Sequence, residues 1–221
     1  MSGRRDNPVE RVIRLKSDRE AERVYLISDT HFFHNVLRKY RPENFEEIIW
    51  NNLNPLVLEK KIDLLIHLGD FAWQIERHER ELVEWKTLKR AIKEILLIVG
   101  NHDEEPDKRK YLRRFFHRIY DFGMEIQYAG YRFLLTHYPA DDEGRSERDR
   151  AMRKKVRETM EKGGYDFLLH GHVHIGENKD GKCKCYEQFG IRCLNLNLEY
   201  TNFKLLNMKE ILERLRETYK L

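Results

Sequence analysis

Five short runs of apolar residues recur along the chain, and each run ends at a polar side chain. The runs cover residues 24–27, 63–68, 95–99, 131–136 and 165–169. Apolar runs of this length are typical of strands that are buried on both faces of an α/β sheet. Because ligands bind at the carboxyl ends of such strands, the polar residues that follow them are candidates for a functional site.

Segments with helical spacing of apolar residues alternate with these runs. A helix is predicted from Pro42 to about Leu53, where Asn54-Pro55 should interrupt it. Further helices are predicted over about residues 76–93, 106–118, 143–162 and 208–219.

Other strand-like segments lie close together and predict hairpins. Residues 12–15 and 24–27 flank the polar segment 17–20, and residues 126–128 and 131–135 flank Gly130. Two short strand-like segments follow later in the chain, at residues 182–186 and 192–198.

The order of these elements predicts the fold class. Strands alternate with helices early in the chain and hairpins dominate late, which favours a layered α/β fold with mixed sheets over a fully parallel sheet. The 221 residues suit one domain spanning residues 1–221, with residues 1–8 as a loose tail.

Composition narrows the choice of partners and location. The net charge is only +4, from 42 Lys and Arg against 38 Asp and Glu, so a nucleic-acid partner is allowed but not indicated. No apolar run approaches the roughly 20 residues that span a bilayer, so no membrane partner is expected. The first ten residues contain charges and no apolar signal region, which predicts a cytoplasmic protein. The oligomeric state stays open.

The three cysteines, Cys183, Cys185 and Cys193, do not form a recognisable zinc motif. They lack a fourth ligand and the usual two-residue spacing, so ordinary hairpin positions are the better interpretation. A disulfide between two of them stays open.

The residues that end the five runs are types that bind divalent metals. Asp and His suit Mn, Fe, Zn or Ni, and a carboxylate can bridge two cations. If the strand ends are extended, residues two apart point to the same side, which pairs Asp29 with His31 and His172 with His174. A lone Asp-x-His is usually a turn, but the complete set predicts a site for two metals. The set comprises Asp29, His31, Asp70, Asn101, His137, His172 and His174.

These blocks together resemble the calcineurin-like metallophosphoesterases. The blocks are Asp29-x-His31, Gly69-Asp70, Gly100-Asn101-His102-Asp103, His137 and Gly171-His172-x-His174, in the family's order. His34, Asn35, Trp50-Asn51 and the segment His67–Phe71 make the likeness closest to a group of small prokaryotic phosphoesterases. The resemblance implies a four-layer α-β-β-α sandwich of two mixed sheets flanked by helices.

The resemblance also implies a division of roles. Two divalent metal ions are expected, with Mn first and Fe, Ni or Zn as alternatives. One metal would be held by Asp29, His31 and His174, the other by Asn101, His137 and His172, and Asp70 would bridge them. A hydroxide between the metals would attack phosphorus in line. His102 would face the leaving group or a phosphoryl oxygen, and Asp103 would orient it.

Residues beside the metal motifs are candidates for the substrate side of the site. Phe32-Phe33 stands where many family members have Gly, so these rings are expected to narrow the mouth of the site. His34 could contact substrate or support the site from behind, or it could be an ordinary packed or solvent-exposed residue. The charged helix over residues 143–162 directly follows His137-Tyr138-Pro139, so Arg145, Arg148 or Arg150 could bind substrate phosphates if it folds over the metal edge.

The leading functional prediction is a phosphodiesterase that hydrolyses small nucleotide-like diesters. A nuclease and a phosphomonoesterase are alternatives within the same family. The 47 residues after His174 are few for the capping domain that DNA-repair members usually add. A non-catalytic scaffold, such as the retromer subunit that shares this fold, is disfavoured because every expected ligand and His102 are present. A structural metal site is disfavoured because such sites are closed and seldom contain two metals.

Overall fold

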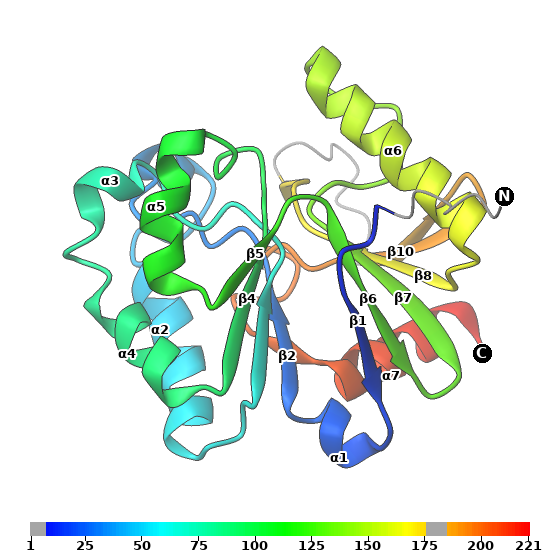
Figure 1. Cartoon of the computed structure of the whole chain (residues 1–221), viewed down its shortest axis with the longest axis horizontal. Coiled ribbons are helices and arrows are strands. Elements are labelled where there is room, and N and C mark those ends of the chain that lie inside the picture. The colour runs from blue at the N-terminus through cyan, green and yellow to red at the C-terminus, as the bar shows by residue number, and fades with distance from the viewer. Residues whose placement is uncertain (1–7, 176–184) are drawn as a thin grey trace, which may run out of the picture.

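The computed structural model of the chain describes residues 8–175 and 185–221. Their strands form a six-stranded sheet with the order β1-β6-β7-β8-β10-β9 and a five-stranded sheet with the order β11-β2-β3-β4-β5 (Figure 1). The first sheet contains β1 (Val12–Leu15), β6 (Gly123–Tyr128), β7 (Tyr131–Thr136), β8 (Phe167–His170), β9 (Cys185–Gln188) and β10 (Ile191–Asn195). The second contains β2 (Val24–Ile27), β3 (Leu64–His67), β4 (Glu94–Ile98), β5 (Arg118–Tyr120) and β11 (Leu206–Asn207).

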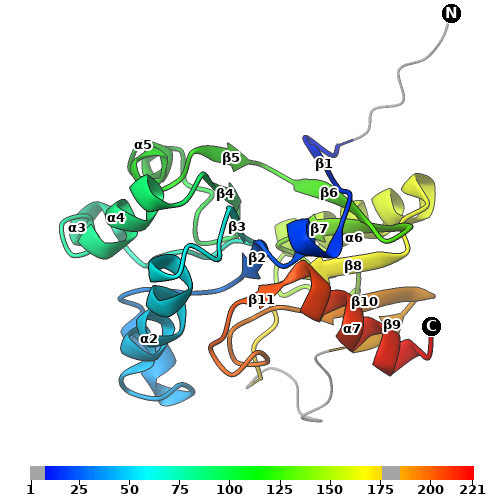
Figure 2. The ribbon, with the colours of Figure 1, turned by 90° about the horizontal axis from the view of Figure 1, so that it is seen from below.

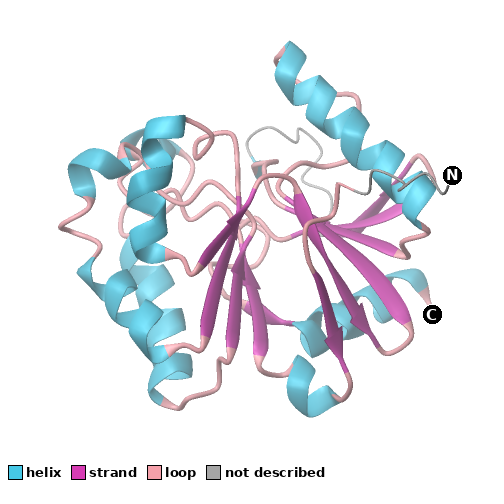
Figure 3. Ribbon diagram, viewed as in Figure 1, coloured by secondary structure: helices cyan, strands magenta, loops and turns pink. Residues whose placement is uncertain are grey.

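Helices flank the two sheets (Figure 3). They are α1 (Asp18–Ala21), the short 3-10 helix η1 (Asn35–Lys39), α2 (Phe45–Leu58), α3 (Ile75–His78), α4 (Val83–Ala91), α5 (Pro106–Phe115), α6 (Glu147–Gly163) and α7 (Met208–Tyr219).

Alternation along the buried strands creates the layers. In β3, Leu65 belongs to the apolar cluster shared with α2, α4 and α5, whereas its neighbour Ile66 belongs to the cluster between the two sheets. On the far face of the six-stranded sheet, Leu168 packs in a cluster with Val156 and Met160 of α6. Residues of α7 complete the core between the sheets along one edge (Figure 2). The predicted mixed α/β fold of two packed sheets flanked by helices is confirmed.

The predicted hairpin of residues 12–15 with 24–27 is wrong. β1 pairs in parallel with β6, while β2 lies in the other sheet between β11 and β3. Ser17 caps the intervening helix α1 by accepting a hydrogen bond from the backbone N–H of Glu20, and this helix redirects the chain. All four residues of β2 are buried, as a central strand requires, whereas Val12 is exposed at an edge.

Helix boundaries also differ from the predicted ones. α2 continues through Pro55 to Leu58, because Leu56 and Val57 pack against the apolar cluster of Tyr25 and Leu53 and support the last turn. The single helix predicted over residues 76–93 is two helices, α3 and α4, and the charged helix predicted from residue 143 starts at Glu147. The hairpin of β6 with β7 and the last helix are confirmed.

Some predictions concern residues beyond the described part of the chain. Most of the predicted N-terminal tail lies outside it. Cys183 also lies outside it, so the structure does not test whether two of the cysteines form a disulfide. Cys193 is buried in β10. Among the described helices, none combines the length and apolar character needed to cross a membrane.

Candidate metal centre

The predicted metal ligands follow strands of both sheets. Parallel strands end at the same edge, so the two sheets bring their polar residues together where they meet. The ligands are Asp29 and His31 after β2, Asp70 after β3, Asn101 after β4, His137 after β7, and His172 and His174 after β8.

The sequence-based argument that Asp29 and His31 point to the same side assumed an extended backbone. The backbone at the candidate ligands is not extended, so that argument is wrong. Asp29, His31, Asp70 and His172 have φ angles of 55°, 47°, 58° and 70°, in the left-handed region. This conformation costs roughly 1–2 kcal/mol for each non-glycine residue and concentrates at functional sites. Left-handed turns, rather than strand alternation, therefore aim the side chains of Asp29 and His31 into one site.

Glycines permit the close approach of the strand ends. A Cβ atom at Gly171 would collide with the side chains of Ser28 and Asp29, which come from the other sheet. A Cβ atom at Gly69 would lie 2.5 Å from Nδ1 of His137, and Gly69 also has a φ of 100°. Gly69 and Gly171 are thus required by contact between the two sheets.

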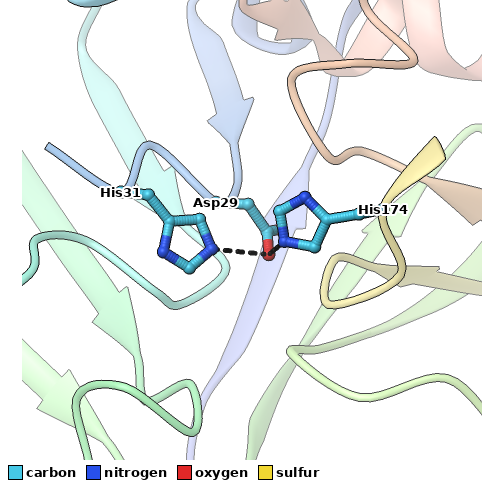
Figure 4. A group of neighbouring side chains, drawn as sticks. All are labelled: Asp29, His31 and His174. Carbon is cyan, nitrogen blue, oxygen red and sulfur yellow. Dashed lines mark ion pairs between the residues drawn. The ribbon is translucent and has the colours of Figure 1, made fainter. Parts of the chain in front are cut away.

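Asp29, His31 and His174 form the first group of ligand atoms (Figure 4). Oδ1 of Asp29 lies 3.7 Å from Nε2 of His31 and 3.9 Å from Nε2 of His174. Asp29 is fully buried and also accepts backbone hydrogen bonds from His172, which fix its carboxylate.

The second group contains Asp70, Asn101, His137 and His172. Oδ1 of Asn101 lies 3.1 Å from Nε2 of His137 and 2.9 Å from Nδ1 of His172. Oδ2 of Asp70 lies 3.5 Å from Nε2 of His137 and equally 3.5 Å from Nε2 of His31. Asp70 therefore stands between the two groups, as a bridging carboxylate would.

These groups fit divalent cations. Atoms that share a cation at about 2.0–2.2 Å lie roughly 3–4 Å apart, which is the spacing found here. Nε2 of His31 is buried without a hydrogen-bond partner and faces the carboxylates of Asp29 and Asp70. Burial, together with the neighbouring charges of Asp29 and Asp103, raises the pKa of Asp70 well above its usual value. A cation bound between these residues would give Nε2 of His31 a partner and would offset the repulsion between the buried carboxylates.

His102 and Asp103 do not form the expected pair. The Asp103 carboxylate instead accepts hydrogen bonds from the backbone N–H groups of Gly100, Asp70 and Phe71. It therefore fixes the ends of β3 and β4 rather than the His102 ring. The His102 ring packs edge-on to His31, with centroids 5.2 Å apart, and burial lowers the pKa of His102 to about 4.

Two carboxylates that the sequence analysis did not single out contact the histidines of the last block. Glu199 is bound to His174, and Asp149 lies beside His172. Burial opposes ionisation of Glu199, but the contacts with His174 and Arg41 lower the pKa of Glu199 to about 2. No motif or spacing in the sequence distinguishes these two residues from the many other acids.

A cleft of about 440 Å³ opens over the candidate ligands. His34, Leu37 and Tyr40, in or directly beside η1, line it together with Arg145, which precedes α6, and Arg148 in the first turn of α6. Arg148 forms an ion pair with Glu104 at 2.6 Å. His34 and Arg145 thus lie at the cleft, whereas Arg150 is not among its lining residues; a substrate-side role stays a prediction.

Phe32 and Phe33 do not narrow the mouth of the cleft. Phe32 is buried against Trp50 and Trp85, because its backbone continues the sheet edge by bridging to Ala72. Phe33 has a φ of 66°, which turns its ring away to stack on His78 with centroids 4.5 Å apart. The predicted substrate-side role of Phe33 is therefore not supported by its position.

Two packed mixed sheets with an Asp, His and Asn cluster at their shared edge define a metallophosphoesterase-type architecture. The chain belongs to the calcineurin-like phosphoesterase superfamily, whose domain model matches residues 23–195. Members of this superfamily are generally phosphoester hydrolases and typically bind divalent metals.

Proteins from several organisms match most of the chain. A crystal structure of a protein of unknown function from Aquifex aeolicus is 38% identical, with a TM-score of 0.71, over 86% of this chain and 98% of that chain. An uncharacterized protein of Methanocaldococcus jannaschii is 28% identical over 199 residues, which is 86% of this chain and 90% of the relative. A more distant structure, nuclease MPE from Pseudomonas putida, is 23% identical with a TM-score of 0.43 over 70% of this chain and 62% of that chain.

Proposed function

We propose that the protein is a metal-dependent phosphoesterase with two divalent cations, and that it hydrolyses small nucleotide-like phosphodiesters. The observation that carries the proposal is the convergence of Asp29, His31, Asp70, His137 and His172 on one edge, with the buried Nε2 of His31 left without a hydrogen-bond partner. Superfamily membership supports the reaction class.

The proposed ligands divide into two sets. Asp29, His31 and His174 would hold one cation, and Asn101, His137 and His172 the other, with Asp70 between them. Mn is the first candidate, because carboxylate, amide and imidazole ligands together suit it. Bound cations would supply an activated water and neutralise charge on the phosphoryl oxygens.

The remaining residues of the cleft would bind and orient the ester. His102 lies beside His31 and can hydrogen-bond to a phosphoryl or leaving-group oxygen. Arg145 and Arg148 supply cationic groups to the cleft wall, where Glu104 pairs with Arg148, and Leu37 with Tyr40 supplies apolar surface. Cationic and apolar lining in a volume of about 440 Å³ support a diester that carries a group on each side of phosphorus.

The proposal is tested by assaying the purified protein with Mn²⁺ against bis(p-nitrophenyl) phosphate and p-nitrophenyl phosphate. Hydrolysis of the diester in preference to the monoester is expected, and it should disappear with chelator or in the Asp70→Asn variant. Preference for the monoester would change the substrate class, and cleavage of linear DNA would favour a nuclease. No metal-dependent hydrolysis of any of these substrates would overturn the enzyme proposal.

A further inference from the structure

We infer that Glu199 and Asp149 are positioning residues that orient His174 and His172 independently, so that each carboxylate governs the cation site of one histidine. The inference rests on the metal centre proposed above. It gives a role to the charged helix α6, which carries Asp149, and to the segment after β10, which carries Glu199.

His174 is held from behind by Glu199. Its Nδ1 lies 2.6 Å from Oε1 of Glu199, and the backbone N–H of Ile175 donates to Oε2 of the same carboxylate at 2.8 Å. The guanidinium of Arg41, fully buried, donates to Oε1 of Glu199 at 2.9 Å. The ionised carboxylate of Glu199 can only accept hydrogen bonds, so Nδ1 of His174 donates to it. Nε2, which faces Asp29, is then the ring nitrogen that would bind a cation.

His172 is held with the opposite ring orientation, because its carboxylate partner contacts Nε2 rather than Nδ1. Its Nδ1 faces the cluster, 2.9 Å from Oδ1 of Asn101, and its Nε2 lies 3.4 Å from Oδ1 of Asp149. Asp149 is fixed in turn by Arg153, whose Nε donates to Oδ1 at 2.6 Å, and Arg153 also pairs with Asp141. Nε2 of His172 is therefore placed to donate to Asp149, and Nδ1, which also lies 3.1 Å from Nε2 of His137, is the ring nitrogen that would bind a cation.

Two histidines only two residues apart thus present different ring nitrogens, and each is backed by a carboxylate with its own buried arginine. A buried carboxylate without a cationic partner would be costly, which explains the pairing of Glu199 with Arg41 and of Asp149 with Arg153. Within residues 8–175 and 185–221, no hydrogen bond or ion pair joins the two supports. Their effects on the two cation sites should therefore be separable.

Manganese binding to the metal-free protein, measured by isothermal titration calorimetry, tests the inference. The wild-type protein should bind two Mn²⁺ ions. Glu199→Gln and Asp149→Asn should each weaken one site by about 10–100-fold and leave the other within about twofold, as expected for the loss of a carboxylate behind a histidine ligand. Glu94→Gln, which changes a half-buried carboxylate that is held by Arg11 and lies outside the cleft, should bind both ions like the wild type.

Double variants assign each support to its histidine. Asp149→Asn should add nothing to His172→Ala but should add fully to His174→Ala, and Glu199→Gln should show the reverse pattern. Variants that leave both affinities unchanged, or that weaken both sites equally, would overturn the inference. A wild-type protein that binds no Mn²⁺ would overturn the proposed metal centre, and the inference with it.

A spectroscopic measurement gives a second readout that does not depend on affinity. Long-range proton–nitrogen NMR spectra of the protein loaded with diamagnetic Zn²⁺ should show the Nδ1–H tautomer for His174 and the Nε2–H tautomer for His172. Glu199→Gln should change the tautomer population of His174 alone. The same tautomer for both wild-type rings would contradict the inference even if the metal centre exists.

Discussion

Asp103 accepts a hydrogen bond from the backbone N–H of Asp70 at 2.7 Å, and so joins the ends of two neighbouring strands. Its carboxylate also accepts from Gly100 and Phe71, so three backbone donors depend on one buried side chain. This contact fixes the turn that carries the proposed bridging ligand. The role expected from the family resemblance, orientation of His102, is not the one the structure gives it.

Replacing Asp103 should therefore disturb stability and metal binding together. Asp103→Ala leaves three buried N–H groups without a partner, and we expect a loss of about 3–5 kcal/mol in the free energy of unfolding. Urea denaturation measures this loss, and weaker Mn²⁺ binding should accompany it. Glu105→Gln, at an exposed neighbouring position, serves as the control. A wild-type unfolding curve for Asp103→Ala would contradict the positioning role.

Replacing His102 should affect catalysis without removing a cation. We expect His102→Ala to lower kcat for the diester by about 10²–10⁴-fold, the range for loss of an acid–base or hydrogen-bonding group. Calorimetry should still count two Mn²⁺ ions. His102 also lies within reach of His31 and Asp70, so loss of one ion in this variant would identify it as a ligand instead.

The cationic wall of the cleft should determine substrate affinity. We expect Arg148→Ala and Arg145→Ala each to raise KM for the diester about 5–20-fold with a smaller change in kcat, because uniform binding would be lost. Arg150→Ala is the matched control, since Arg150 lies on the same helix but does not line the cleft and donates to the carbonyl of Gly144. An equal KM for all three variants would exclude the arginine wall from substrate binding.

The aromatic residues after His31 should affect stability and leave substrate binding unchanged. Phe32→Ala would open a cavity among Trp50, Phe71 and Trp85, and we expect a cost of about 3–5 kcal/mol. Phe33→Ala should leave KM for the diester within about twofold. A large rise in KM for Phe33→Ala would restore the sequence-based interpretation of this ring as part of the mouth.

The ion pair of Asp63, which lies outside the candidate metal centre, should make the free energy of unfolding depend on pH. Arg23 binds its carboxylate through two hydrogen bonds at 2.7 and 2.8 Å, and this contact, with the help of Lys93, lowers the pKa of Asp63 to about 2. A lowered pKa stabilises the fold above the unfolded value of about 3.9, and this contribution is lost as the pH falls through about 2.

The matching variant is Asp63→Asn. Because the pair is partly exposed, we expect it to cost about 1 kcal/mol or less at pH 7, measured by urea denaturation. The difference from wild type should shrink between about pH 4 and pH 2. A difference that stays constant over that range would show that the ion pair does not contribute.

The pattern of apolar and turn residues was sufficient to predict the elements that are stabilised by contacts between residues near one another in the sequence. The hairpin of β6 with β7 follows from a turn at Gly130, and α7 from its apolar spacing. The first predicted hairpin failed because the partner of β1 is β6, more than a hundred residues away, and no feature of residues 12–15 specifies that partner. The predicted interruption of the helix at Asn54-Pro55 is wrong for a related reason. The packing of Leu56 and Val57 outweighs the free-energy cost of a proline inside a helix.

The sequence by itself determined the kinds of candidate ligand, their order and the strand ends that carry them, because ligand chemistry and strand pattern are local properties. Only the tertiary structure decided how those ligands are aimed and held. The left-handed turns at Asp29 and Asp70, the carboxylate of Glu199 behind His174, and the direction of the Phe33 ring all depend on contacts between distant segments. Arg41 and Glu199 are 158 residues apart, and only the meeting of the two sheets makes them neighbours.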